Sequence, residues 1–452
     1  MTASAARSAI VAESRGVSTH GLIACHECDA VYRLEALPEG AAAHCSFCDA
    51  QLYKHVSSHT LEQSIALHFA ALMLFIIANT LPFISLKFAG RVETDMLMSG
   101  PMALFNIGMD GIGLLVLMTS ILFPLLSMVA ALYLLIAARL DVQPPGKGMV
   151  YRMVRFLAPW SMLGVFMLAV LIAIVKLLDL AEIEAGIALF AFAALLPVSV
   201  MAQQRFDSSL FWPHQFCEGG RDGGKNGEIN PNSALKGGLL HCHTCALLVE
   251  QSKHGSHCPR CGGHLHARKP DSLARTWALL IAAIVMLLPA NILPIMTVIR
   301  FGQGEPSTIL AGVVHLIGAG MWPLGLIIFF ASIMVPVSKL VALVFLLFSV
   351  QRKSTWKPDD RTRLYRVTEM IGSWSMVDIF IIGILTSLVS LDALSTIRPG
   401  AAASYFAGAV VLTMLAAQSF DPRLIWDDLE RCNEHDGNDK STDALPMEQA
   451  HG

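Results

Sequence analysis

The chain has 452 residues, of which 54% are hydrophobic and only 15% charged, and its net charge is -3. Soluble proteins carry roughly a quarter charged residues, so this composition favours a membrane protein. The small net charge gives no support for a partner such as nucleic acid or for an acidic substrate.

The chain begins with residues 1–20, which contain no apolar core long enough for a cleavable signal peptide. We expect this N-terminus to be disordered and to stay in the cytoplasm. Six further segments are predicted in chain order: a small four-cysteine unit at 21–58, a strongly apolar unit at 59–212, a linker at 213–237, a second four-cysteine unit at 238–270, a second apolar unit at 271–427 and a disordered C-terminal tail at 428–452.

Eight cysteines form two sets of paired CxxC motifs. The ligand sets are Cys25, Cys28, Cys45 and Cys48, and Cys242, Cys245, Cys258 and Cys261. Paired motifs at this spacing are typical of tetrahedral zinc held by four thiolates. Disulfides are disfavoured in a reducing cytoplasm, a thioredoxin-type redox site needs one motif rather than two facing pairs, and a rubredoxin-type iron site remains an alternative. We therefore predict two structural Zn²⁺ sites with no catalytic role.

Eight apolar segments are each long enough to cross a membrane, which takes about twenty residues. They are predicted at 64–86, 111–138, 156–177, 186–202, 273–299, 321–350, 371–391 and 401–418. The fold class expected is an all-α polytopic membrane protein with two tandem transmembrane units of four helices, 59–212 and 271–427. Each unit is preceded by a small four-cysteine zinc ribbon, at 21–58 and 238–270.

The basic residues indicate the orientation of the spans, because basic loops face the cytoplasm. Two loops, between the second and third spans and between the sixth and seventh, carry Arg139, Lys147, Arg152, Arg155, Arg352, Lys353, Lys357, Arg361, Arg363 and Arg366. The opposite side carries Lys87, Arg91, Lys176, Arg300 and Arg398. Both termini and the central linker are therefore predicted to be cytoplasmic, with only short loops outside.

The chain repeats itself at an offset near 212–217 residues. The matching pairs include Ala78-Asn79-Thr80-Leu81-Pro82 with Ala290-Asn291-Ile292-Leu293-Pro294, and Trp160-Ser161-Met162 with Trp374-Ser375-Met376. Four spans in each copy give both halves the same orientation, so we expect parallel repeats related by an axis along the membrane normal.

Polar groups inside the predicted spans are concentrated in the second half. Lys339 and Asp378 each cost about 2.5–3.5 kcal/mol at a helix centre unless paired or hydrated. Pro336 cannot donate to the carbonyl of Ser332, so a kink is expected there, and Thr413 adds a hydroxyl at a similar depth. The pair could be a static ion pair that locks two helices or a proton relay.

The first half lacks this charge. Its counterparts of Ser332, Pro336 and Lys339 are Ser120, Pro124 and Ser127. Gly164 and Ser199 stand in the places of Asp378 and Thr413. The asymmetry suggests that function depends on the second half.

From Cys25 to about Trp426 the pattern resembles the paraquat-inducible protein A family, the PqiA/LetA-like proteins of bacterial inner membranes. The resemblance rests on the CxxC pairs, the repeated Ala-Asn-x-Leu-Pro motif, Val335-Pro336-Val337-Ser338-Lys339, Trp374-Ser375-Met376-Val377-Asp378 and Ser419-Phe420-Asp421. It implies a component of an MCE-type lipid transport system, with a separate periplasmic MCE-domain protein and phospholipids as partners. It also implies that Ser332, Lys339, Asp378 and Thr413 form a transmembrane polar cluster.

Three functions follow from this sequence. The first is phospholipid transport between the inner membrane and the MCE tunnel, driven by protons; no Walker motif is present, so ATP hydrolysis would need another subunit. The second is a scaffold that only anchors the MCE protein. The third, a membrane redox protein using the cysteines, is disfavoured if both cysteine sets hold metal. We do not expect an enzyme.

Overall fold

The computed structural model describes residues 21–427, apart from 35–36, 39–40, 55–57, 89–90, 178–181, 213–232, 301–302, 319, 321 and 389–394. The predicted disordered segments 1–20 and 428–452 lie outside the described residues, as does most of the predicted linker 213–237.

Each half begins with a small β unit that carries one cysteine set. Ribbon 1 (residues 21–54) consists of two antiparallel hairpins, β1 (Leu22–Ala24) with β2 (Val31–Arg33) and β3 (Ala42–His44) with β4 (Gln51–Lys54). Ribbon 2 (residues 233–270) contains the hairpin β8 (Leu239–His241) and β9 (Leu248–Glu250), followed by the short turn η4 (Gln251–Lys253).

The helical part of the first half follows ribbon 1. Its elements are α1 (Ser58–Thr80), β5 (Ile84–Phe88), β6 (Arg91–Asp95), α2 (Ser99–Asn106), α3 (Asp110–Leu117), η1 (Met118–Leu122), α4 (Phe123–Arg139), α5 (Lys147–Leu157), η2 (Ala158–Trp160), α6 (Leu163–Leu177), β7 (Glu182–Ala185), α7 (Ile187–Arg205) and η3 (Ser208–Leu210).

The second half repeats this order after ribbon 2. Its elements are α8 (Ser272–Ile292), β10 (Met296–Arg300), β11 (Gln303–Ser307), α9 (Ile309–Gly318), α10 (Trp322–Phe329), η5 (Phe330–Met334), α11 (Val335–Gln351), α12 (Pro358–Gly372), η6 (Ser373–Met376), α13 (Val377–Leu388), β12 (Ser395–Pro399) and α14 (Ala401–Ser419).

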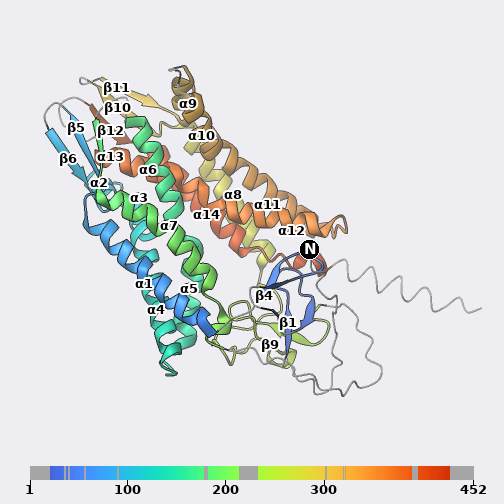
Figure 1. The fold of residues 1–452 in the computed structure, drawn as a ribbon. Helices are drawn as coiled ribbons and strands as arrows, with labels where there is room; N and C mark the ends of the chain where they lie inside the picture. Colours follow the sequence, from blue (N-terminus) through green and yellow to red (C-terminus); the bar gives the residue numbers. More distant parts are fainter. Residues whose placement is uncertain are drawn as a thin grey trace, which may run out of the picture.

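The described chain contains eight helices that are long and apolar enough to cross a membrane. The predicted class, a polytopic membrane protein built from two tandem four-helix units that each follow a four-cysteine unit, is confirmed. In Figure 1 the helices form one elongated bundle with the ribbons at one end and strands β5, β6 and β10–β12 at the other. We call these the ribbon end and the sheet end.

The sheet end contains structure that the sequence reading did not include. One antiparallel sheet has the order β6-β5-β7 and the other the order β11-β10-β12. The predicted spans 64–86 and 273–299 ran into these sheets and were wrong at their ends. The helices end at Thr80 and Ile292, because the residue before a proline disfavours helix and Pro82 and Pro294 follow.

The repeated Ala-Asn-x-Leu-Pro motif forms this junction between helix and sheet. Nδ2 of Asn79 donates to the carbonyl of Phe75 at 2.8 Å, one helical turn earlier. Gly186, which leads into α7, approaches so closely that a Cβ atom there would lie 2.1 Å from the carbonyl oxygen of Pro82. The second half repeats this contact between Gly400 and Pro294, at 2.2 Å.

The two halves share one apolar core. It joins side chains of α1, α6 and α7 to side chains of α13 and α14. Phe166 on α6 contacts Phe380 on α13 edge-to-face, with 5.3 Å between ring centroids. Such aromatic pairs stabilise packing beyond the area they bury, so α6 and α13 form a central seam between the halves.

Candidate functional site: two cysteine clusters and a polar cavity between the halves

All four CxxC pairs fold into the same tight turn. The amide of the residue after the second cysteine donates to the carbonyl of the first cysteine at 2.8–3.0 Å. That following residue has a positive φ in every case: Asp29 at 66°, Asp49 at 60°, Ala246 at 58° and Gly262 at 70°. The turns point both thiols of each pair inward.

The thiols of each ribbon converge on one point. Sγ atoms of facing cysteines lie 3.5 Å (Cys25–Cys48), 3.4 Å (Cys28–Cys45), 3.6 Å (Cys242–Cys261) and 3.6 Å (Cys245–Cys258) apart. Four thiolates around a tetrahedral ion with bonds near 2.3 Å would lie about 3.8 Å apart, whereas a disulfide needs about 2.05 Å. All eight residues are buried. The two clusters therefore have the donor set and the spacing to hold one metal ion each.

Each ribbon is tied to the helices of the opposite half. Nε of Arg366 on α12 donates to the Glu27 carboxylate of ribbon 1 at 2.8 and 2.9 Å, and its Nη2 donates to the carbonyl of Cys48 at 2.6 Å. Arg152, the counterpart of Arg366 on α5, donates to the carbonyl of Gly262 in ribbon 2. Each ribbon therefore contacts a helix of the other half, an arrangement that sequence order alone does not predict.

A buried ionic network fixes both ribbons to the end of α14. Arg423 and Asp421 are each 1% exposed. The guanidinium of Arg423 donates to both Asp421 oxygens at 3.1 and 3.0 Å, contacts His243 at 2.7 Å, and lies 3.7 Å from Asp29 of ribbon 1. Burial opposes ionisation of Asp421, but the hydrogen bonds and charge of Arg423 hold the pKa of this carboxyl well below its usual range.

Arg268 continues this network between the ribbons. Its guanidinium donates to both oxygens of Asp427 at 3.1 and 2.6 Å and to Asp29 at 3.0 Å. The burial of Arg268 acts against its charge, yet these carboxylates raise its pKa above the ordinary value. Ribbon 1, ribbon 2 and the segment after α14 are thus locked together by paired buried charges.

The four polar residues predicted inside the membrane are all buried. Ser332 is 1% exposed, Lys339 3%, Thr413 4% and Asp378 8%. They lie on η5, α11, α14 and α13, and contacts link η5 with α13 and with α11, and α11 with α14. The expected irregularity before Pro336 takes the form of a π-helical turn, η5, and the first half has a matching turn, η1, before Pro124.

Lys339 is the most unusual of these groups. Among the described residues its Nζ has no hydrogen-bond partner, and the same holds for Oγ of Ser332. In the first half, Oγ of Ser120 donates to the carbonyl of Val116 at 2.7 Å. A Cβ atom at Gly372 would lie 2.7 Å from Nζ of Lys339, so this glycine makes room for the amine.

The sequence reading missed Glu369. This residue lies on α12, one turn before Gly372, and its carboxylate is the charge that acts on Lys339. It was overlooked because 358–370 is strongly charged and was assigned to a loop. The signal that could have identified it is position: Glu369 follows Arg366 by three residues, so both share one helix face.

Lys339 and Glu369 line a cavity of about 530 Å³ between the two halves. The first half contributes Ala158, Pro159, Ser161, Met162, Gly164 and Val165, and the second half adds Arg366, Met370, Gly372, Met414, Ala417 and Gln418. All the charged residues of the lining, Lys339, Arg366 and Glu369, come from the second half. A cavity of this size that holds charged groups has room for many water molecules.

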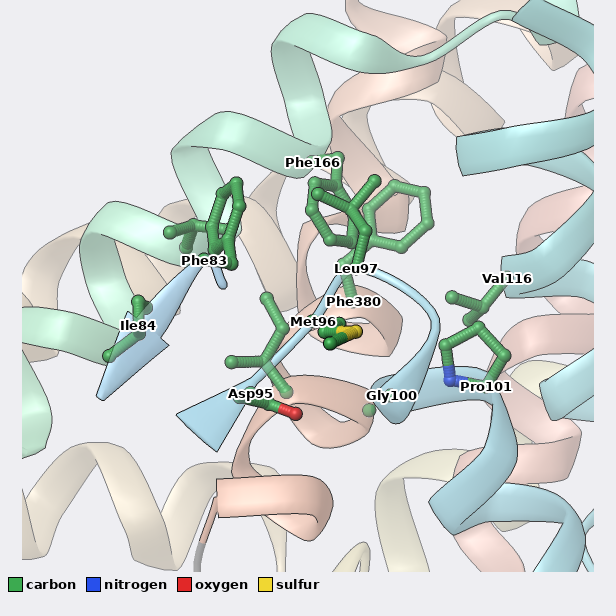
Figure 2. Close-up of a pocket in the computed structure, with 13 residues that line it drawn as sticks. Phe83, Ile84, Asp95, Met96, Leu97, Gly100, Pro101, Val116, Phe166 and Phe380 are labelled. Carbon is green, nitrogen blue, oxygen red and sulfur yellow. The ribbon is translucent and has the colours of Figure 1, made fainter. Parts of the chain in front are cut away.

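A second, much smaller pocket of about 20 Å³ lies near the sheet end. Figure 2 shows Met96, Leu97 and Phe166 of the first half around this pocket, together with Phe380 of the second half. Asp95 is the single ionisable residue among its lining. At this end the two halves therefore meet through apolar side chains with space for about one water.

These features define a class: a polytopic membrane protein made from a duplicated four-helix unit, with two metal-type cysteine ribbons and an internal charged cavity. The sequence pattern described as paraquat-inducible protein A matches twice, over residues 61–215 and 273–430. Together with the relatives below, this match shows that the chain belongs to the paraquat-inducible protein A family, and the predicted recognition is confirmed.

Three bacterial relatives extend over nearly the whole chain. The "Intermembrane transport protein PqiA" of Escherichia coli K12 is 32% identical over 409 residues, which covers 90% of this chain and 95% of the relative. "Lipophilic envelope-spanning tunnel protein A" of the same strain is 31% identical over 412 residues, 90% of this chain and 92% of the relative. A "Probable intermembrane transport protein" of Haemophilus influenzae is 27% identical over 414 residues, with 90% and 95% covered. No solved structure matches the chain.

Proposed function

We propose that this chain is an inner-membrane component of an MCE-type lipid transport system. It moves phospholipid between the inner membrane and a periplasmic tunnel made by a separate MCE-domain protein, and it is a transport component rather than an enzyme. Support comes from relatives named as intermembrane transport and envelope-spanning tunnel proteins. The observation that carries a transport role is Lys339, a buried amine without a hydrogen-bond partner among the described residues, beside a large cavity.

The polar cluster Ser332, Lys339, Asp378 and Thr413 is proposed as the proton-coupled part of the mechanism. A static ion pair would satisfy the amine of Lys339 directly, and that amine makes no hydrogen bond with any described residue. A buried ionisable group held without a direct partner is costly in a membrane and is typical of ion pathways. Changes in its protonation could bias the packing of α11 against α13 and so drive lipid movement.

The ribbons are proposed to hold zinc, one Zn²⁺ in each set of four cysteines. Four thiolates close the coordination sphere, so the ions would stabilise the ribbons rather than bind substrate. Both ribbons, both termini and the linker are proposed to be cytoplasmic, and the basic loops support this orientation. In this orientation the sheet end faces the periplasm, where the MCE partner would dock.

The association is tested by purifying the chain with its periplasmic MCE-domain partner from a native membrane. The proposal expects a stable complex that retains phospholipid, identified by mass spectrometry of the extracted lipids. An MCE-domain protein that never co-purifies, even after cross-linking at the sheet end, would contradict it.

A further inference from the structure

The cavity connects Lys339 with the ribbon end of the bundle. Arg366, which lines it, pairs with Glu27 of ribbon 1, and the carbonyl of Gln418, another lining residue, accepts from Nζ of Lys269 in ribbon 2 at 2.7 Å. Glu369 is exposed. Lys339 lies twelve residues before the end of α11 at Gln351, which corresponds to about 18 Å along the helix. The cavity thus reaches from the ribbon end to about mid-membrane.

Towards the sheet end the same interface is closed. Gly164 lines the cavity, and two residues later Phe166 packs against Phe380. Asp378 lies two residues before Phe380 and is 8% exposed. The rings of Phe166 and Phe380 also line the small pocket near the sheet end, whose volume of about 20 Å³ has space for about one water. Lys339 and Glu369 therefore face a cavity that opens towards the ribbon end, whereas packed aromatic rings close the interface towards the sheet end.

We propose that this cavity is a water-filled vestibule that gives Lys339 access to the ribbon side, and that Glu369 passes protons between that water and Lys339. This deepens the proposed function, and its role in transport rests on that function. In the transfer the O–H bond of protonated Glu369 breaks and an N–H bond forms on neutral Lys339, directly or through one water. A carboxylate and an ammonium remain, and the carboxylate takes the next proton from water at the ribbon side.

Charged groups around the vestibule suit this exchange. Glu369 faces Lys339 on α11, Lys269 before α8, and Glu27 and His26 of ribbon 1. Arg366 shares the vestibule but is held by Glu27 and Cys48. Glu369 is therefore the carboxylate exposed to the vestibule that also acts on Lys339.

Access is tested with Lys339→Cys in a chain that also carries Cys217→Ser and Cys432→Ser. A membrane-impermeant, charged methanethiosulfonate is applied to vesicles of both orientations, and the labelled peptide is quantified by mass spectrometry. Leu343→Cys is the matched control, because Leu343 lies one turn nearer the ribbon end yet is 0% exposed and does not line the cavity. If Lys339→Cys does not fold, Gly164→Cys replaces it, since no atom lies within 4 Å of a Cβ there.

The vestibule predicts that Lys339→Cys is labelled at least about tenfold faster from the ribbon side than from the sheet side, and faster than Leu343→Cys. Gly164→Leu, which fills the vestibule from the opposite wall, should slow this labelling about tenfold. Faster labelling from the sheet side, or a rate no higher than that of Leu343→Cys, overturns the proposal. These labelling rates involve no lipid transport, so they test access to the vestibule independently of the proposed function.

The role of Glu369 is tested by pH-difference infrared spectroscopy of the reconstituted chain. The carbonyl band of a protonated carboxylic acid should disappear in Glu369→Gln and remain in Glu369→Asp and in the exposed control Glu62→Gln. Its titration midpoint should move by about one pH unit in Lys339→Met, because the two groups interact. A band that is unchanged in Glu369→Gln, or a midpoint unaffected by Lys339→Met, contradicts proton exchange between them.

Discussion

The buried pair of Asp421 and Arg423 predicts a large and specific loss of stability for Asp421→Asn. Both residues are 1% exposed, and Asp421 accepts two hydrogen bonds from the guanidinium of Arg423 and one from the backbone amide of Lys269. Removing one partner of a buried pair costs about 3–5 kcal/mol, because the other charge is left uncompensated. The carboxylate of Asp29, which lies 3.7 Å from the guanidinium of Arg423, still compensates part of the Arg423 charge in this variant. We therefore expect about 3 kcal/mol, or roughly a hundredfold in the unfolding equilibrium.

Asp207 is the matched control, because it holds the position of Asp421 in the first half. Its carboxylate caps a short turn by accepting from the amide of Ser209 at 2.9 Å. Asparagine caps such turns as well as aspartate does, so Asp207→Asn should change the free energy of unfolding by no more than about 0.5 kcal/mol. Denaturant titration of the purified protein in mixed micelles measures both variants. Equal losses in the two variants, or an unchanged stability of Asp421→Asn, would refute the reasoning.

The pair of Asp421 and Arg423 also predicts that the free energy of unfolding depends on pH. The pKa of Asp421 is lower in the folded chain than in the unfolded chain. The stabilisation is therefore complete above the unfolded value of about 3.9 and is lost as the pH falls through the lower folded value. The difference in stability between wild type and Asp421→Asn should decrease below about pH 4.

The remaining predictions concern the metal and the orientation. Cys245→Ser should lower bound zinc from two ions per chain to one and reduce the yield of folded protein. The control Cys432→Ser should keep both ions. Elemental analysis that finds no metal in wild-type protein kept reduced throughout purification would refute the assignment. Pro306→Cys on β11 should react with an impermeant thiol reagent added outside intact cells and Gln143→Cys should not, and the reverse pattern would invert the proposed topology.

Much of the architecture could be predicted from the sequence because the signals are local. Hydropathy located eight spans, and the spacing of cysteines located two metal-type clusters. The first span was predicted to continue to residue 86, because average hydropathy does not separate the end of a helix from a strand that follows it directly. The strand β5 has the alternating sequence Ile-Ser-Leu-Lys-Phe, a pattern typical of a strand. Pro82 carried the missing information.

Two parts of the site depend on contacts that no local pattern encodes. The crossing of the ribbons, with Arg366 on Glu27 and Arg152 on Gly262, joins segments that are far apart in the chain. Glu369 lines the same cavity as Lys339 only because α12 packs against α11 and lies opposite the turn between α5 and α6. Both features arise from the packing of the two halves.

The central claim is that the second-half polar cluster drives lipid transport, and one measurement tests it most directly. Wild-type chain and the double variant Lys339→Met, Asp378→Asn are reconstituted in liposomes, and transfer of fluorescent phospholipid to the MCE-domain partner is followed. Replacing both charges leaves no uncompensated buried charge, so the variant should fold stably. We predict that it remains stable and binds the partner but transfers lipid at no more than about a tenth of the wild-type rate, equivalent to a barrier increase of about 1.4 kcal/mol. Normal transfer by the folded double variant would contradict the account and favour a scaffold that only anchors the MCE protein.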